Sequence, residues 1–575
     1  MTAPRAARWA AMAAASTVLL AGCAAGAPGG ALGDGASGSR NGDSADGGSA
    51  DGGVGGGGGG GGGAGGAGGT VRAADALCAA DSDRQMRGAW LTTVRNIDWP
   101  SEPGLSADEQ KAELDAYLDD AVAMGLNAVF LHVRPTADAV YASDKEPWAR
   151  YLTGEQGGDP GYDPLEYAVA RAHERGLEMH AWFNPYRVGL QDPDIENLVD
   201  DHPVKKNPEW LVDYGTEAYV DPGNPEVREW VTGVIMDVVE RYDIDGVHFD
   251  DFFYPYPKDG EEFDDDASWE AHGGDFDDRG DWRRDNVDQL MRDVHGAIQE
   301  TKPWVSFGVS PFGIWRNQST DPSGSPSSGL QSYDAQYADT RTWIREGTVD
   351  YVAPQLYWER GFGTADYEAL TDWWADEVAG SGVELYIGQA AYRLGESGWT
   401  SDDALSTQLD YSGELEEVGG DVYFSIKSLR QNRDAVEHLL GGHYADPALP
   451  PRTDSGEEEA RVGAVAGVSA AAVDGDGDGG RGGSGGEGEG EGRVEVTWEA
   501  AEGARFYAVY RLPAQVAEAG DETVCEALTP ANLVGVTGGT AFDDTGAGDD
   551  VVYAVTALDD YRAQGPLGGV ADPRG

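Results

Sequence analysis

Two adjacent acidic residues, Asp250 and Asp251, are the clearest candidates for chemistry in this sequence. They close the segment Asp245–Asp251, which reads DGVHFDD and has the alternation of a β-strand. Because side chains alternate along a strand, His248 and Asp250 share one face, and Val247, Phe249 and Asp251 share the other. We therefore expect His248 and Asp250 to point to the inside of the fold, and Asp251 to begin the next loop.

Paired carboxylates are what hydrolysis of a glycosidic bond requires. One protonates the leaving oxygen, and the other stabilises or attacks the cationic sugar. We expect Asp250 to be ionised and a partner to hold the proton. Asp251 and Glu396 are the two candidates for this acid, and Asp251 is favoured because the adjacent charge would raise its pKa. Two other interpretations are open: the pair caps the next segment, or it binds calcium together with the acidic run Glu261–Asp266.

Polar and aromatic residues also end the other apolar runs of the chain. Any one of them has a simpler explanation as part of a surface loop, but in a barrel these ends would meet at one mouth. Indole faces can stack on sugar rings, although tryptophan is also a common core residue. Arg187, Ser310, Tyr392 and Lys427 occupy such ends. The residues expected to bind substrate are His132, Arg134, Asn184, Tyr186, His248, Trp315, Arg316, Asn317, Gln355, Tyr357 and Trp358.

The elements that must position these residues repeat one unit, in which an apolar run is followed by a polar loop and an amphipathic helix. The runs are Arg87–Val94, Asn127–Val133, Leu177–Asn184, Asp245–Asp250, Trp304–Ser310, Asp350–Tyr357, Val383–Ala390 and Asp421–Ile426. The helices expected between them include Ala107–Met124, Pro164–Arg175, Pro225–Tyr242, Asp285–Thr301, Asp334–Arg345 and Tyr367–Val378. Eight strands with intervening helices predict an α/β fold, a (β/α)8 TIM barrel over residues 81–450. An open doubly wound sheet would usually carry a glycine-rich phosphate loop after its first strand, and Arg95–Pro100 is no such loop.

Residues 460–570 predict a small all-β sandwich domain. Val494–Trp498, Phe506–Tyr510 and Val551–Ala557 have the composition of strands, and a tryptophan strand followed by tyrosine-rich strands resembles a fibronectin type III module. The acidic, glycine-rich tract at 474–492 interrupts this unit and is expected to be a disordered insertion.

Composition excludes several classes of partner. The 575 residues include 40 Lys+Arg and 103 Asp+Glu, a net charge of −63 that would repel nucleic acid and anionic membrane surfaces. An aromatic-rich chain with many carboxylates suits a carbohydrate ligand. Cys78 and Cys525 have no metal-ligand spacing and either pair or stay as free thiols. We expect a monomer with no metal and no cofactor.

The N-terminus predicts export and lipidation. Arg5 and Arg8 precede an apolar stretch that ends in Leu20-Ala21-Gly22-Cys23, which resembles the bacterial lipobox. We expect residues 1–23 to be a lipoprotein signal peptide, Cys23 to carry the lipid, and residues 24–80 to form a disordered glycine-rich tether. The chain would then be lipid-anchored at the extracytoplasmic face of the cell membrane. An ordinary signal peptide, or a short membrane anchor, is the alternative.

Several longer motifs resemble the glycosyl-hydrolase-like family 10 envelope lipoproteins. They are Met86–Val94, His180–Arg187, Asp245–Pro257, Gly308–Pro311, Trp315–Asn317 and Ala353–Trp358, and the resemblance covers about Met86 to Tyr444. It implies a (β/α)8 barrel glycosidase anchored outside the cytoplasmic membrane, in a family of which some members are thought to cleave peptidoglycan glycan strands, including strands stripped of stem peptides. It also implies Asp250 and Asp251 as the catalytic pair and Glu396 as a third carboxylate.

Taken together, the sequence favours an envelope-anchored glycoside hydrolase acting on an amino-sugar polymer, namely the glycan strands of peptidoglycan. A non-catalytic glycan-binding surface lipoprotein is the alternative. A metal-dependent polysaccharide deacetylase would need clusters of His and Asp ligands, which the sequence lacks.

Overall fold

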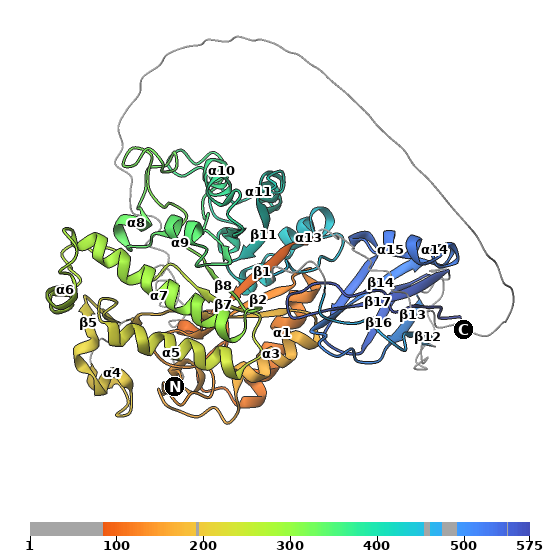
Figure 1. Cartoon of the computed structure of the whole chain (residues 1–575), viewed down its shortest axis with the longest axis horizontal. Coiled ribbons are helices and arrows are strands. Elements are labelled where there is room, and N and C mark those ends of the chain that lie inside the picture. The colour runs from red at the N-terminus through yellow and green to blue at the C-terminus, as the bar shows by residue number, and fades with distance from the viewer. Residues whose placement is uncertain (1–83, 191–194, 454–459, 474–491, 549, 575) are drawn as a thin grey trace, which may run out of the picture. The chain divides into compact units, whose positions relative to one another are not determined.

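The computed structural model describes residues 84–190, 195–453, 460–473, 492–548 and 550–574 (Figure 1). The predicted signal peptide, Cys23 and the tether lie outside these ranges, as does the predicted insertion except for Gly492. Within the described residues, no helix has both the length and the apolar composition needed to span a bilayer.

Eight parallel strands close into a barrel, which confirms the predicted (β/α)8 fold. Their order around the barrel is β1-β11-β10-β9-β8-β7-β3-β2. Each lies within or beside one of the apolar runs identified from the sequence. The strands are β1 (Met86–Leu91), β2 (Ala128–Arg134), β3 (Glu178–Phe183), β7 (Gly246–Phe249), β8 (Ser306–Val309), β9 (Tyr351–Val352), β10 (Glu384–Gln389) and β11 (Val418–Tyr423).

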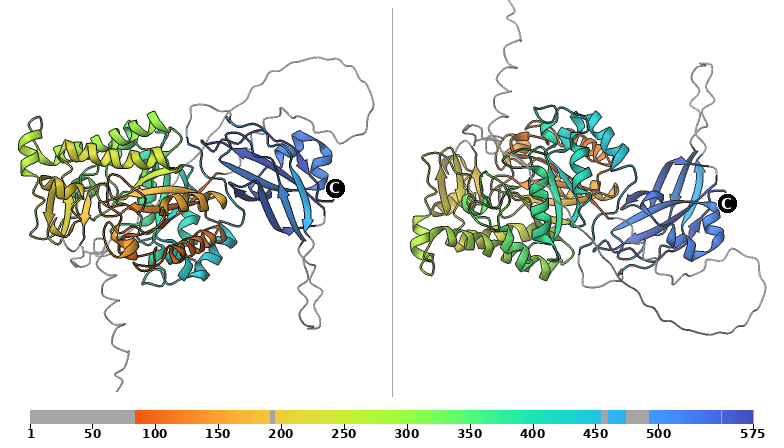
Figure 2. Two further views of the ribbon diagram at one scale, coloured as in Figure 1. Left: turned by 90° about the horizontal axis from the view of Figure 1, so that it is seen from below. Right: turned by 90° about the horizontal axis from the view of Figure 1, so that it is seen from above.

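Helices surround the strands, and α5 and α7 run alongside each other (Figures 1 and 2). The longer ones are α1 (Ala107–Ala123), α3 (Pro164–Glu174), α5 (Pro225–Arg241), α7 (Arg279–Thr301), α10 (Tyr367–Val378), α11 (Ala404–Ser412) and α13 (Arg433–Gly442). The shorter ones are α2 (Arg150–Thr153), α4 (Pro203–Lys206), α6 (Asp266–His272), α8 (Ser332–Ala335), α9 (Thr340–Glu346) and α12 (Ile426–Gln431). Single 3-10 turns occur at Val94–Asn96, Ile195–Asn197, Pro208–Trp210, Ala391–Arg393 and Pro530–Asn532.

Local sequence explains where the helices begin. Ser106 and Glu109 form a reciprocal capping box at the start of α1. Asp163 caps α3 through the amides of Leu165 and Glu166. Asp278 caps α7, so this helix begins six residues before the predicted Asp285. The single helix predicted over Asp334–Arg345 is instead two short ones, α8 and α9.

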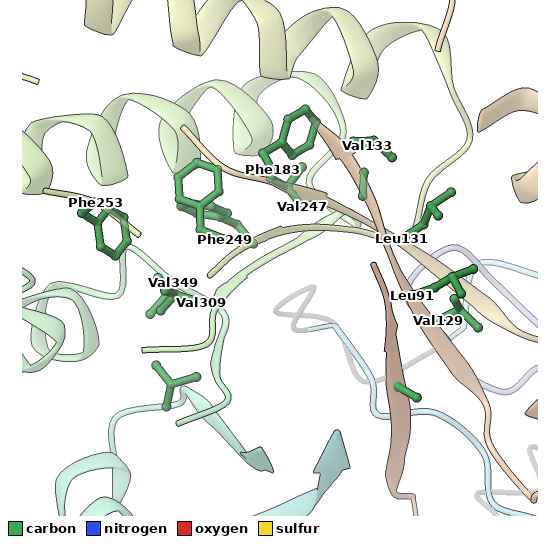
Figure 3. Close-up of a cluster of buried hydrophobic side chains, with 14 of the residues drawn as sticks. Leu91, Val129, Leu131, Val133, Phe183, Val247, Phe249, Phe253, Val309 and Val349 are labelled. Atoms are coloured by element: carbon green, nitrogen blue, oxygen red, sulfur yellow. The ribbon is translucent and has the colours of Figure 1, made fainter. Parts of the chain in front are cut away.

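Alternation along the strands divides the barrel into two apolar layers. Outward-facing side chains pack under the helices (Figure 3). They include Leu91, Val129, Leu131, Val133, Val247, Phe249 and Val309. Inward-facing side chains fill the barrel, and they include Trp90, Phe130, Trp182, Tyr351, Tyr386 and Val422. His248 contacts this inner set, so its predicted direction is confirmed.

A small antiparallel sheet that the sequence analysis did not predict lies between β3 and α5. It has the order β4-β6-β5 and consists of β4 (Arg187–Gly189), β5 (Leu211–Tyr214) and β6 (Glu217–Val220). The amide of Val220 donates to the carbonyl of Tyr186 at 2.8 Å, which ties this sheet to the carboxyl end of β3.

The C-terminal region contains two antiparallel sheets with a shared core. One has the order β12-β13-β16, from Ser469–Val473, Gly492–Thr497 and Ala541–Ala547. The other has the order β15-β14-β17-β18, from Leu533–Thr537, Phe506–Pro513, Val551–Leu558 and Val570–Ala571. Side chains of β13 and of the neighbouring Trp498 pack with those of β14 and β17. The opposite side chains of β14 and β17 pack in a second cluster beside α14 (Ala514–Ala519) and α15 (Asp521–Glu526).

Candidate active site

Asp250 and Asp251 follow the last residue of β7, at the carboxyl end of the barrel, where glycosidases of this fold carry their catalytic groups. Both are buried, with 6% and 5% of their surface exposed. Uncompensated burial of two adjacent carboxylates is unfavourable, so their surroundings decide which of them is ionised.

Among the described residues, one side chain and one backbone N–H donate to the carboxylate of Asp250. The amide nitrogen of Asn184, directly after β3, lies 3.3 and 3.4 Å from its two carboxylate oxygens, and the backbone N–H of Phe252 donates at 3.2 Å. Burial is the largest influence and, together with the charge of Asp251, it raises the pKa of Asp250 to about 7 against the opposing charge of Arg187. Near neutral pH, Asp250 is therefore able to hold a proton.

Asp251 is surrounded by more donors. The hydroxyl of Tyr256 and the amides of Gln355 (3.1 Å) and Gln336 (3.4 Å) all donate to its carboxylate. Burial raises the pKa of Asp251, while these hydrogen bonds oppose that effect because they favour the ionised form. Since, among the residues that the structure describes, three side chains donate to Asp251 and one donates to Asp250, the geometry favours Asp250 as the carrier of the proton.

Asn184 is held in place by a buried ion pair. Arg134 pairs with Glu146 at 2.6 Å, with both side chains fully buried, and its Nη1 donates to the carbonyls of Asn184 (2.6 Å) and Pro185 (3.0 Å). The side-chain oxygen of Asn184 accepts the N–H of Arg187 at 3.0 Å, which leaves its amide nitrogen to donate to Asp250. Arg134 thus contacts the backbone that orients Asn184.

Three further predicted substrate-binding residues lie inside the fold. His248 is buried below Asp250, and both of its ring nitrogens have partners within the protein. His132 is buried and stacks on Trp182 with ring centroids 3.9 Å apart. Burial, then the charge of Arg187, holds the pKa of His132 well below its usual value. Tyr186 packs in the outer hydrophobic layer.

Trp315, Arg316 and Asn317 make their contacts within the loop after β8 and the helices that follow it. Trp315 stacks on Trp373 at 6.0 Å, and its N–H donates to Asp339 at 3.3 Å. Arg316 pairs with Asp334 (2.8 Å) and Asp321 (3.2 Å). The side chain of Asn317 bonds to both backbone polar groups of Gly329 at 2.9 Å. No hydrogen bond or ring contact within the described ranges joins these three residues to the acidic pair.

Aromatic side chains lie near the acidic pair. The ring of Trp358 meets that of Phe312 edge-on at 5.6 Å, and Phe312 lies 6.3 Å from Tyr256, the donor to Asp251. Tyr357 lies 5.6 Å from Tyr392. The ring of Tyr256 therefore lies beside Asp251, and those of Phe312 and Trp358 follow it in a series of ring contacts. An aromatic ring beside a carboxylate is typical of a sugar-binding site.

Glu396 lies in a different environment from the pair. It follows the turn after β10 and pairs with Arg393 at 3.2 Å, with 53% of its side chain exposed. Arg393 also donates to the carbonyl of Tyr357 at 2.8 Å. Within the described part of the chain, no hydrogen bond links Glu396 to Asp250 or Asp251.

Comparison with known proteins shows which family the chain belongs to. A family profile described as glycosyl hydrolase-like 10 matches residues 85–405. The chain belongs to the glycosyl hydrolase-like 10 family. Glycosyl hydrolase YngK of Bacillus subtilis is 48% identical over 379 residues, which cover 65% of this chain and 74% of that protein. Glycosyl hydrolase DigH of Escherichia coli K12 is 39% identical over 383 residues, which cover 62% and 87%. The PgaB (BpsB) glycoside hydrolase domain from Bordetella bronchiseptica aligns with 62% of this chain and 97% of its own, with 14% identity and a TM-score of 0.42.

This chain of the glycosyl hydrolase-like 10 family is therefore a glycoside hydrolase. Its structure brings to the acidic pair three side chains that were not predicted to serve the site: Arg187, Gln336 and Tyr256. Arg187 stands at the end of an apolar run, and this position in the sequence could have been used to predict it as a site residue. Gln336 ends α8, 85 residues after Asp251, and no local pattern in the sequence indicates this contact.

The calcium interpretation of the acidic run gains no support in this glycoside hydrolase. Among the residues that the structure describes, no group of three or more His, Cys, Asp or Glu is placed to hold a metal ion. Within the run, Asp265 is buried and paired with Arg279 and Arg283. Those arginines supply the compensating charge that a cation would otherwise provide.

Proposed function

We propose that this glycoside hydrolase cleaves the glycan strands of peptidoglycan at the outer face of the cytoplasmic membrane, where a lipid on Cys23 anchors it. The observation that carries the proposal is the buried pair Asp250–Asp251 at the barrel mouth, in which one carboxyl has a pKa of about 7 and the other is surrounded by donors. Acid-assisted hydrolysis of a glycosidic bond needs one protonated and one ionised carboxyl group in this way.

In the proposed reaction, Asp250 gives its proton to the glycosidic oxygen as the bond from that oxygen to the anomeric carbon breaks. The carboxylate of Asp251 faces the positive charge that develops on the sugar ring or on its N-acetyl group. Water then adds to the anomeric carbon and returns a proton to Asp250. The sequence alone suggested the opposite roles, whereas the donor count around each carboxyl favours this one.

The choice of peptidoglycan is supported by Arg187 and by the predicted anchor. Arg187 is 2% exposed, and its guanidinium lies 4.8 Å over the ring of Phe252 and makes a long 3.4 Å bond to the carbonyl of Pro135. A cation beside the acidic pair suits the lactyl carboxylate of a muramic residue, which is free once the stem peptide is removed. The predicted lipobox and tether would hold the barrel beside the cell wall.

Product analysis tests this proposal directly. The full chain carrying Cys23→Ala, purified from the soluble fraction, is incubated with glycan strands prepared with and without stem peptides. We expect new reducing ends and short muramic-containing products from the stripped strands, and a weaker preference for stripped strands in Arg187→Met. The proposal would be contradicted if neither substrate gave new reducing ends.

Anchoring has its own test. Cys23→Ala should release the protein from the membrane fraction, because lipidation requires that thiol. If the variant fractionates with membranes as firmly as the natural chain, the lipid anchor is wrong, and the hydrolysis assay is unaffected.

A further inference from the structure

An arginine of the C-terminal region reaches the amino end of the barrel. Arg562 is 1% exposed, its Nε donates to Glu178 at the start of β3, and its Nη2 lies 3.1 Å from Asp245, just before β7. Burial alone would raise the pKa of Glu178, but the charge of Arg562 and the hydrogen bond from His180 hold it below its usual value. Glu178 is thus a buried carboxylate that Arg562 keeps ionised.

From Glu178, a hydrogen-bonded chain runs up the inside of the barrel. Nε2 of His180 lies 3.1 Å from Glu178, Nδ1 of His180 lies 3.4 Å from the hydroxyl of Tyr351, and that hydroxyl lies 3.0 Å from Nδ1 of His248. Phe130 stacks on His180 at 4.4 Å and meets His248 edge-on at 4.9 Å. The apolar ring of Phe130 therefore packs against both imidazole rings of this chain, which leaves them few alternative hydrogen-bond partners.

The indole of Trp90 determines which way these hydrogen bonds point. Its N–H, which can only donate, lies 3.1 Å from Nε2 of His248, so Nε2 must accept. Nδ1 of His248 then carries the proton and donates to Tyr351. Tyr351 donates in turn to His180, and His180 donates to Glu178. Every bond of the chain points toward the carboxylate that Arg562 holds ionised.

At its upper end, the chain reaches the acidic pair. The hydroxyl of Ser310 lies 3.0 Å from Nε2 of His248, and the carbonyl of Ser310 accepts the amide of Gln355 at 3.0 Å. The same amide donates to Asp251 at 3.1 Å. His248 lies on β7, two residues before Asp250. A movement of its ring would therefore be transmitted to both carboxylates.

We infer that Arg562 is a positioning residue for hydrolysis, which acts on the acidic pair through the hydrogen-bonded chain Glu178–His180–Tyr351–His248. This inference rests on the proposed roles of Asp250 and Asp251. Without Arg562, a protonated Glu178 would donate to His180, and every bond above it would reverse. Nε2 of His248 would then carry a proton facing the indole N–H of Trp90. The ring would have to move, and with it Ser310 and the end of β7.

Arg505 supplies a matched control for this inference. It enters the same interface and bonds to Asp245 at 2.6 Å and to Asp243 at 2.9 Å, but within the described residues it makes no hydrogen bond to Glu178. Arg562→Met removes the charge at the foot of the chain. Tyr351→Phe breaks the chain in the middle by removing one oxygen atom and leaves Arg562 in place. The double variant tests whether the two changes act on the same path.

The test measures kcat and KM on stripped glycan strands for these variants and for Arg562→Lys, with melting curves to confirm folding. We expect Arg562→Met and Tyr351→Phe each to lower kcat about tenfold, with KM within about twofold. The double variant should be no slower than the slower single one, and Arg562→Lys should recover part of the rate. Arg505→Met should lower the melting temperature without lowering kcat. Equal losses in Arg562→Met and Arg505→Met, or losses that multiply in the double variant, would overturn the inference.

A spectroscopic readout separates this inference from the proposed function. In ¹⁵N-histidine-labelled protein, with His248 assigned by its loss in His248→Gln, Nε2 of His248 should be unprotonated in the natural chain and in Arg505→Met. It should become protonated in Arg562→Met. A His248 ring that is unchanged in Arg562→Met would overturn the inference, whether or not the chain proves active on peptidoglycan.

Discussion

The two ends of β7 carry buried aspartates in opposite electrostatic states. Asp245, just before the strand, accepts from Arg505 (2.6 Å), Arg562 (3.1 Å) and His173 (2.8 Å), and its charged neighbours outweigh burial and hold its pKa well below the usual value. Asp250, just after the strand, has an Asn184 amide and one backbone N–H, and burial raises its pKa to about 7. Burial is similar at both sites, so the difference comes from the direct cation partners.

This difference separates a structural carboxylate from one able to transfer a proton. Two arginines make Asp245 a permanent anion that holds the C-terminal region to the barrel. Near Asp250, Arg187 acts through its charge and, within the described residues, makes no hydrogen bond to the carboxylate, while Asp251 opposes ionisation. A proton donor at neutral pH has to be protected from strong ion pairing, and this protection lowers the stability of the ionised fold.

Asparagine substitutions at the two ends should have opposite effects on stability. Asp245→Asn leaves two buried arginines short of a partner and should reduce the free energy of unfolding by about 3–5 kcal/mol. Asp250→Asn removes a charge that the fold disfavours and should leave the free energy of unfolding equal or higher. Urea unfolding at pH 7.5 measures both. Similar destabilisation by the two variants would show that Asp250 is also a structural anion.

The pH dependence of stability should differ in sign between the two aspartates. The pKa of Asp250 is raised from about 4 in the unfolded chain to about 7, so its ionisation lowers stability progressively as pH rises through this window, by about 4 kcal/mol at most. The pKa of Asp245 is lowered, so its contribution is present above pH about 4 and is lost as pH falls further. Unfolding of the natural chain and Asp250→Asn from pH 4 to 8 tests the first part. Parallel curves would contradict it.

Two glutamines sharpen the comparison between the barrel mouth and the outer face of the barrel: Gln355 lies shortly after β9, and Gln389 ends β10. Gln355 donates to Asp251 at 3.1 Å, and Gln389 donates to Asp421 at 2.8 Å on the outer face, where burial raises the pKa of Asp421 to about 7. Gln355→Leu should lower kcat about tenfold, the value of one hydrogen bond to a charged group. Gln389→Leu should lower the melting temperature and leave kcat within about twofold. A larger kcat loss in Gln389→Leu would remove the distinction.

The exposed carboxylate Glu396 should show the smallest effect. It pairs with Arg393 on the surface, and exposed pairs of this kind contribute little. Glu396→Gln should change kcat by less than about twofold and stability by less than about 0.5 kcal/mol. A loss of a hundredfold or more would make Glu396 a catalytic group and Asp250 a weaker candidate for the acid.

Much of the fold could be predicted because its signals are local. Eight apolar runs indicated the barrel, and alternation within DGVHFDD placed His248 inside it. The amphipathic pattern also placed the start of α3 at Pro164, as observed. The sheet of β4, β5 and β6 was missed because its strands are only three or four residues long, too short for a periodic pattern.

The protonation of the acidic pair could not be predicted from its sequence. Adjacency affects the pKa of Asp250 and Asp251 symmetrically, so only donors from elsewhere distinguish them. Gln336 and Gln355 reach Asp251 across 85 and 104 positions of the chain. The contacts of Arg562 span still greater separations, with 384 positions between it and Glu178. Such contacts follow from the closed fold and leave no local pattern.

The most direct test of the central claim compares Asp250→Asn and Asp251→Asn on natural glycan and on an activated aryl glycoside, whose leaving group needs little protonation. Loss of a general acid typically lowers the rate by on the order of 10²–10⁴. We predict that Asp250→Asn loses hydrolysis of natural glycan by this factor but cleaves the aryl glycoside nearly as fast as the natural chain, while Asp251→Asn is impaired on both. Near-normal hydrolysis of natural glycan by Asp250→Asn would contradict the account.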